Sequence, residues 1–429
     1  MSKRFLIIHG HFYQPPREEP YSLKIEKQVS AFPYKNWNER INRECYAANA
    51  ASRVLDERGR IVDIINNYEY ISFNFGPTLL LWLKKESPST YEKIIEADYN
   101  SREKNNGHGN AIAQVYNHII LPLACDRDIV TEIEWGLKAF EKDFGRSSEG
   151  IWLSETAVND KVVEFLIAYG IKFIILSPFQ AAEVSPDNKK WNDVSDGSID
   201  PSKPYLLEES NGKIAVFFYY KELASKVSFE HLLRNVEFLR GEILKYNNST
   251  LIHYATDGEV YGHHEPFGDM CLSRLIYENR ARNEFTFTNY ANFLEKHPPS
   301  DYVRLKKGND GLGTSWSCVH GVDRWRKDCG CSTGGKEGWN QKWREPLRNA
   351  FDFLRDRLFD KAEQFLNNYL ADIWHARNNY IDVVYTEDFR EREKRIDEFL
   401  KKHLNFSVSE EIRVKILKFF EALHMELLM

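Results

Sequence analysis

Two carboxylates follow apolar runs that have the character of buried strands. Glu155 follows the run 150–154, and Asp257 follows the run 251–256. Carboxylates placed just past the strands of an α/β barrel lie at the rim where substrates bind. Cleavage of a glycosidic bond requires one carboxylate that attacks and one that supplies a proton. Glu155 and Asp257 are therefore the candidate catalytic residues. The competing interpretation is that each acid caps a helix or is a surface charge.

Histidines and amides gather near the same predicted strand ends. His9 and His11 alternate along the first apolar run and so project to one side, and Gln14 follows them. Asn110 and His118 flank a third run. Groups of this kind hydrogen-bond sugar hydroxyls, so we assign all five to substrate binding. The alternatives are metal ligation by the histidines and a polar loop around a buried strand.

The last apolar run leads into a second polar cluster. Asp257 and Glu259 alternate, and His263 and His264 follow them. We assign Glu259 and both histidines to substrate binding, together with Trp152, which precedes the first carboxylate by three positions. Mixed carboxylate and imidazole groups also suit zinc or manganese, which is the alternative for this cluster.

Apolar runs alternate with helical patterns along most of the chain. The runs that predict strands are 5–11, 71–75, 111–116, 150–153, 173–176, 214–219 and 251–256. The helical patterns are 41–58, 78–86, 129–144, 157–169, 229–245, 346–369, 387–403 and 409–428. Repeated β-α units predict an α/β fold with a parallel sheet, and this number of strands fits a closed barrel better than a small open sheet.

Two segments interrupt the alternation and define the expected domains. The Pro- and Asp-rich segment 177–212 predicts a long insertion at the rim, where loops contribute to binding clefts. A Gly-, Trp- and Cys-rich segment precedes the helical end. We predict a barrel over residues 1–306, a connector over 307–341 and a helical domain over 342–429.

Composition excludes several classes of function. The chain of 429 residues has a net charge of −6 and no basic helix face, which argues against nucleic acid as a partner. No apolar stretch reaches the length of a membrane span, and the first run is too short for a signal peptide. Six cysteines in such a chain are expected to be reduced thiols, so we expect a cytoplasmic protein. The oligomeric state is left open.

The connector contains Cys318, His320, Cys329 and Cys331, which are residue types that bind zinc. Their spacing differs from the standard zinc-finger patterns, so tightly packed reduced thiols are the preferred interpretation. A structural metal and a redox Cys-x-Cys pair are the alternatives. We accordingly predict no cofactor and no metal.

The order of these motifs resembles glycoside hydrolase family 57. His-x-His with Gln-Pro, Gly-Asn with a later His, Trp-Leu-x-Glu, and Asp-x-Glu with Gly-His-His follow one another, and Thr314-Ser315-Trp316 resembles the family's last signature region. The resemblance implies an incomplete (β/α)7 barrel followed by a helical domain. It also implies activity on α-linked glucans with retention of configuration. The residues matched are Glu155 as nucleophile, Asp257 as acid/base, Trp316 in the substrate site, and His9, His11, Trp152, Glu259 and His263 at the donor subsite.

This resemblance leads to one preferred function and two alternatives. We predict a retaining α-glucan hydrolase or 4-α-glucanotransferase whose two carboxyl groups lie about 5–5.5 Å apart. The first alternative is a metal-dependent polysaccharide deacetylase or mannosidase-like barrel that uses His9, His11, Asp257 and His263 or His264. The second is a non-catalytic glucan-binding protein.

Overall fold

Parallel strands form the centre of the structure, a computed structural model that describes residues 4–19, 24–331, 335–386 and 388–428. β1 (Phe5–Phe12) pairs in parallel with β12 (Leu251–Asp257), with β4 (Ser72–Phe75) and, at its start, with β13 (Thr286–Phe287). Every residue of β1 is buried, as expected of a strand that is covered on both faces.

The parallel pairing continues through shorter strands. β5 (Ala113–Gln114) pairs with β6 (Ile151–Trp152), and β7 (Phe173–Leu176) pairs with β11 (Gly212–Phe218). Single bridges join β4 to the chain before β5, and the chain before β6 to β7. Each predicted strand is present, and the α/β class is confirmed. The described strands fall into four separate sheets, so the seven-stranded barrel remains a prediction.

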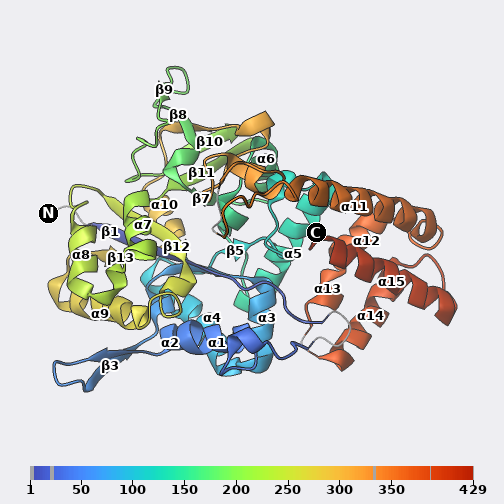
Figure 1. The fold of residues 1–429 in the computed structure, drawn as a ribbon, viewed down its shortest axis with the longest axis horizontal. Helices are drawn as coiled ribbons and strands as arrows, with labels where there is room; N and C mark the ends of the chain where they lie inside the picture. The colour runs from blue at the N-terminus through green and yellow to red at the C-terminus, as the bar shows by residue number, and fades with distance from the viewer. Residues whose placement is uncertain (1–3, 20–23, 332–334, 387, 429) are drawn as a thin grey trace.

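The segment 177–212 is not a loop, contrary to the sequence prediction. It contains β8 (Ala181–Ser185), β9 (Asn192–Asp193) and β10 (Tyr205–Glu209), which join β14 (Tyr302–Leu305) in the sheet of β7 and β11. These strands lie at the top of Figure 1. β10 buries alternate side chains and β9 buries none. None of the three strands is apolar throughout, so a search for continuous apolar runs did not find them.

The predicted helix 41–58 is wrong in its second half. Helical structure ends at Ala50, and the chain then forms a hairpin of β2 (Ser52–Leu55) and β3 (Ile61–Ile65), which projects at the lower left of Figure 1. Gly59 adopts a φ of 75° in the hairpin turn, a conformation that glycine tolerates.

Helices flank the strands. Those of the α/β part are α1 (Trp37–Ile41), α2 (Ala47–Ala50), α3 (Pro77–Glu86), α4 (Pro88–Lys104), α5 (Asp126–Phe144), α6 (Asp160–Ala168), α7 (Lys221–Phe229), α8 (Val236–Leu244), α9 (Gly268–Arg282) and α10 (Tyr290–Lys296). The predicted helix 229–245 begins later than expected, at Val236, where the Asn235 side chain caps α8, and α7, which ends at Phe229, was not predicted. No helix in the described ranges has the length and apolarity that a membrane crossing requires.

The C-terminal helices have a hydrophobic core of their own. They are α11 (Arg344–Leu366), α12 (Ile373–Asn379), α13 (Ile381–Val384), α14 (Phe389–His403) and α15 (Glu410–Glu426). The predicted start of α14 at Glu387 lies outside the described residues. Figure 1 shows these helices, orange to red, as a group beside α5. Tyr116 and Trp135 of the α/β part belong to this second core, so the helices pack directly on the flank of the strands.

A buried ion cluster joins the helical region to α5. The Arg377 guanidinium nitrogen Nη2 lies 2.7 Å from Asp128 Oδ1 on α5 and 3.0 Å from Glu426 Oε2 on α15. All three side chains are buried. Removal of one partner from such a cluster leaves charge in a medium that cannot solvate it. Arg377 is therefore a main attachment point between the two regions.

We predict that Arg377→Ala lowers the free energy of unfolding by about 3–5 kcal/mol, because the buried Asp128 loses its counter-charge and Glu426, whose pKa burial raises to about 8, loses its hydrogen-bond donor. The matched control is Arg395→Ala on α14, where the arginine forms only solvent-exposed pairs; its effect should stay within about 0.5 kcal/mol. Urea unfolding followed by circular dichroism measures both. Equal stability of the two variants would remove Arg377 from this role.

Candidate active site

Glu155 lies directly after β6 in a short 3₁₀ helix, Ser154–Thr156. Its φ of 56° is a left-handed conformation, which costs an ordinary residue about 1–3 kcal/mol. The connector holds it there. Trp316 donates its backbone N–H to the Glu155 carbonyl oxygen at 3.1 Å and its indole N–H to Glu155 Oε2 at 3.0 Å. The Ser317 hydroxyl donates to the same carboxylate oxygen. Three hydrogen bonds from the connector thus fix this residue.

Asp257 is the last residue of β12 and lies opposite His11 of β1 in the parallel register. Its side chain reaches solvent. Protein nevertheless surrounds the recess closely enough that lost hydration, together with the charge of Glu155, raises the pKa of Asp257 to about 6. The structure therefore brings the two candidate carboxylates within electrostatic reach of each other.

Flat rings form a wall next to the carboxylates. His9 and His11 both stack on the indole of Trp152, with ring centroids 4.8 and 5.1 Å away. Trp316, which holds Glu155, meets the same indole edge-on at 5.1 Å. His118 stacks on His11 at 4.9 Å. Rings packed at this spacing give a rigid surface with few polar atoms.

The imidazoles of this wall are neutral at physiological pH. Burial lowers the pKa of His9 to about 3 and that of His118 to about 4, and it lowers the pKa of His11 well below its ordinary value. The Asn74 side chain lies 3.1 Å from His9 Nε2 and 2.8 Å from His11 Nδ1. His11 Nε2 lies 2.9 Å from His118 Nε2. These histidines act as neutral hydrogen-bonding groups.

Glu259 is a buried carboxylate near Asp257. Tyr46 donates its hydroxyl to Glu259 Oε1 at 2.6 Å, and the Tyr13 backbone N–H donates to the same oxygen at 3.3 Å. Burial, reinforced by the charge of Asp257, raises the pKa of Glu259 to about 8 despite the Tyr46 hydrogen bond. Tyr46 ends a π-helix, Asn42–Tyr46, an irregularity that frequently occurs at functional sites.

Three other candidates lie around this group. His263 Nδ1 is 2.5 Å from Glu44 Oε2, and His264 is exposed. Gln14 accepts a hydrogen bond of 2.7 Å from Arg17. Among the described residues, the only group whose ligand atoms gather as a metal requires is in the connector, and it contains none of the histidines at 9, 11, 263 and 264.

Asn110 is a correction to the predicted site. It precedes β5, at the end of that strand opposite to the carboxylates, and it is buried. Its amide donates to the Tyr68 carbonyl oxygen at 3.0 Å and accepts from Asn289 at 3.0 Å. The polar groups of Asn110 are thus used by the fold, because a buried amide must be paired.

Sequence analysis also missed residues that contact the site. Ser317 adjoins Trp316, and this adjacency is the signal that would have identified it. Tyr46 and Asn74 lie inside ordinary helical and strand patterns. Nothing in those patterns distinguishes a tyrosine or an asparagine that supports a site from one that fills the core.

A cavity of about 300 Å³ opens beside Glu155. Its lining comes from the α/β part, the connector and the C-terminal helical region, and includes Asn117, His118, Trp325, Glu426 and Leu428. A second cavity of about 690 Å³ shares Asn117 and Leu428 with the first. The C-terminal helical region therefore forms part of the wall of the candidate active site.

A recess with two carboxylates on an α/β fold is the arrangement of a glycosidase, and the comparison of sequences identifies the family. Residues 6–306 match the model of glycosyl hydrolase family 57, so the chain belongs to this family. Residues 339–429 match a domain of unknown function, DUF3536.

Known members of the family show what this chain is similar to. Alpha-amylase 1 of Dictyoglomus thermophilum is 25% identical over 238 residues, which cover 55% of this chain and 31% of that protein. The 4-alpha-glucanotransferase of Thermococcus litoralis is 21% identical over 254 residues, which cover 58% and 36%. An exo-type maltose-forming amylase from Pyrococcus sp. ST04 shares the fold, with a TM-score of 0.71 at 15% identity over 100% of this chain and 74% of that one. The matched region spans about a third of the curated relatives.

We predict that Asp257→Asn raises the melting temperature at about pH 8 and leaves it nearly unchanged at about pH 4. The pKa of this carboxyl is raised from 3.8 to about 6 by folding, so stability falls as the pH rises through this interval. The amide does not titrate and escapes this loss. Calorimetry at both pH values measures the effect, with the exposed Asp397→Asn as the control. Equal shifts at the two pH values would contradict the raised pKa.

Proposed function

We propose that this protein is a retaining enzyme that acts on α-glucans, either a hydrolase or a 4-α-glucanotransferase. Glu155 is its nucleophile and Asp257 its acid/base, at the carboxyl ends of strands of an incomplete (β/α)7 barrel. The observation that supports these roles is the unlike surroundings of two neighbouring carboxylates in a member of glycosyl hydrolase family 57.

The two environments suit different roles. Glu155 accepts the Trp316 indole N–H and the Ser317 hydroxyl on one oxygen, which orients the carboxylate for attack. Asp257, whose pKa is raised to about 6, keeps a proton available for a departing oxygen. A carboxyl group with a raised pKa beside an oriented carboxylate suits the roles of acid and nucleophile.

The reaction proceeds in two displacements. A Glu155 carboxylate oxygen attacks the anomeric carbon, the glycosidic C–O bond breaks, and Asp257 gives its proton to the departing oxygen. Water or an acceptor sugar hydroxyl then gives a proton to Asp257, attacks the anomeric carbon and releases Glu155. Each step inverts the configuration, so the product retains it.

The wall of rings forms the sugar-binding part of the proposal. The partly exposed Trp316 supplies flat apolar surface and packs edge-on against the fully buried Trp152, and the neutral His11 and His118 suit hydroxyl groups that carry no charge. The relatives named as amylase and 4-alpha-glucanotransferase support an α-linked glucan as the substrate class. We place the enzyme in the cytoplasm, where its six unpaired cysteines stay reduced.

We predict that Glu155→Gln lowers kcat on maltooligosaccharides by about 10³-fold or more while glucan binding remains measurable. The amide keeps the size of the side chain and cannot form the glycosyl-enzyme, so the loss falls on the chemical step. Product analysis by size and linkage, with maltooligosaccharides and glycogen as substrates, measures turnover and separates hydrolysis from transfer. Titration calorimetry measures binding.

The matched control for this experiment is Glu410→Gln, at an exposed glutamate on α15. It should show wild-type turnover. Wild-type turnover by Glu155→Gln would remove Glu155 as the nucleophile. Binding of glucans by the wild-type chain with no turnover of any of them would favour the non-catalytic alternative.

A pH profile tests the role of Asp257 separately. We predict that kcat/KM falls tenfold per unit above about pH 6, because only the protonated acid can assist the departing oxygen. An α-maltosyl fluoride has a leaving group that needs no proton, so its first step should lack this alkaline limb. If the rate falls above about pH 6 in the same way for both substrates, the fall is caused by a group other than Asp257.

A further inference from the structure

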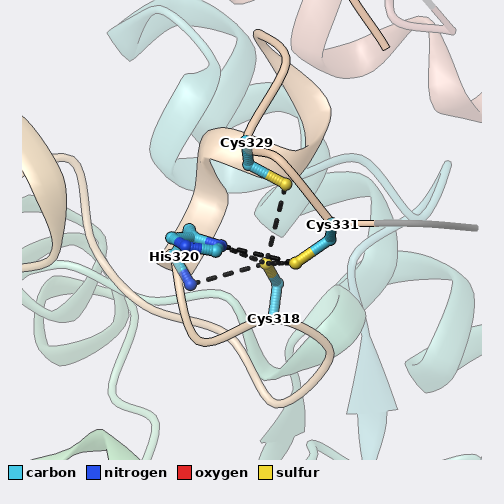
Figure 2. Close-up of side chains that lie close together, drawn as sticks. All are labelled: Cys318, His320, Cys329 and Cys331. Atoms are coloured by element: carbon cyan, nitrogen blue, oxygen red, sulfur yellow. Dashed lines mark hydrogen bonds between the residues drawn. The ribbon is translucent and has the colours of Figure 1, made fainter. Parts of the chain in front are cut away.

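The connector brings three thiols and one imidazole to a single point. Cys318 Sγ lies 3.7 Å from Cys331 Sγ, 3.9 Å from Cys329 Sγ and 3.6 Å from His320 Nδ1. His320 Nδ1 lies 3.4 Å from Cys331 Sγ. Figure 2 shows the four side chains directed toward one another from different parts of the loop. All four potential ligand atoms lie within 4.8 Å of one another.

These distances match the edges of a zinc tetrahedron. Zinc binds sulfur at about 2.3 Å and nitrogen at about 2.0–2.1 Å, so neighbouring ligands lie about 3.8 Å apart for two sulfurs and about 3.6 Å for sulfur and nitrogen. Disulfide sulfurs lie about 2.05 Å apart, and the three cysteines are unpaired. Thiols are weak hydrogen-bond donors, so mutual hydrogen bonds give little reason for three of them to converge.

We propose that this cluster binds one zinc ion through Cys318, His320, Cys329 and Cys331. Binding releases the three thiol protons and uses the neutral imidazole, so a dication is held by three thiolates. Four protein ligands complete the tetrahedron and leave no position for a substrate or a catalytic water, which makes the site structural.

The irregular fold of the connector indicates that a bound metal would stabilise its conformation. In the described part of the connector, helical structure is limited to two short 3₁₀ helices, Asn309–Gly311 and Gly321–Trp325. A loop of this kind has few backbone hydrogen bonds to order it. The zinc ion cross-links Cys318 and His320 to Cys329 and Cys331, and so closes the loop between them in a segment too small for a core of its own.

The zinc site adjoins the residues that hold the candidate nucleophile. Trp316 and Ser317 directly precede Cys318 and donate the hydrogen bonds to Glu155. Trp325, between the ligands in sequence, lines the cavity beside Glu155. The zinc ion therefore positions Trp316 and Ser317, and this second part of the inference rests on the proposed function.

Metal content tests the site without reference to activity. We expect the protein from zinc-supplemented cells to contain about one zinc per chain by mass spectrometry, and cobalt exchanged into the site to show thiolate charge-transfer and tetrahedral absorption bands. Cys331→Ala should lose most of the metal, whereas Cys271→Ala, at a buried thiol on α9, should keep it. His320→Cys should retain the metal through four thiolates. Wild-type protein with no bound zinc and no cobalt bands overturns the proposal, even where a variant fails to fold.

Removal of zinc from the wild-type protein tests the positioning role. We expect a chelator to increase hydrogen exchange in residues 314–331 and to lower kcat on maltooligosaccharides at least tenfold with little change in KM, both reversed by added zinc. Metal binding with unchanged exchange and unchanged kcat overturns the positioning role. An absence of turnover in both forms, with zinc-dependent exchange intact, overturns the proposed function and leaves the zinc site standing.

Discussion

The burial of one carboxyl group beside a charged one is the constraint around which this site is built. Glu155 lies just beyond β6 and Asp257 ends β12, in two different sheets, yet the charge of Glu155 acts on Asp257. The protein accommodates them differently. Glu155 receives donors from the connector, whereas lost hydration, together with the charge of Glu155, raises the pKa of Asp257 to about 6. The left-handed backbone at Glu155 persists because the hydrogen bonds from Trp316 over-determine it.

Support for these groups comes from distant parts of the chain. The connector reaches back to Glu155, and the C-terminal helical region contributes Glu426 and Leu428 to the neighbouring cavity. Arg377 links α15 to α5, so the cavity wall is tied to the flank of the strands by a buried ion cluster. The helical region thus shapes the site, although it contains neither candidate catalytic carboxylate.

The sequence predicted the strands that are apolar throughout, such as β7, because burial on both faces leaves an uninterrupted signal. It failed for β10, which buries one face, and for β2, which lies within the predicted helix 41–58. Strand-end position and motif order are the signals on which the prediction of both carboxylates rests. Contacts such as that of Tyr46 with Glu259 depend on tertiary packing between segments far apart in sequence. Patterns within a single sequence do not reveal such packing.

The interpretation of the connector cysteines as packed thiols rested on their spacing in the sequence. Spacing predicts a metal site well only when the ligands lie on a hairpin or a helix of standard geometry. Here the chain between His320 and Cys329 turns through Gly321 at a φ of 66° and a 3₁₀ helix, so an unfamiliar spacing still brings the ligand atoms together. The positions of the four ligand atoms therefore favour the proposed zinc site over packed thiols.

The composition of the cavity wall has a consequence for the order of events during synthesis. The α/β part leaves the ribosome first and can pack its own core, since domains generally fold as units from the N-terminal side. The residues of the C-terminal helical region that line the cavity beside Glu155 emerge much later. A nascent chain therefore leaves the cavity beside Glu155 open until α15 docks, so the site is completed only after this late segment has been synthesised.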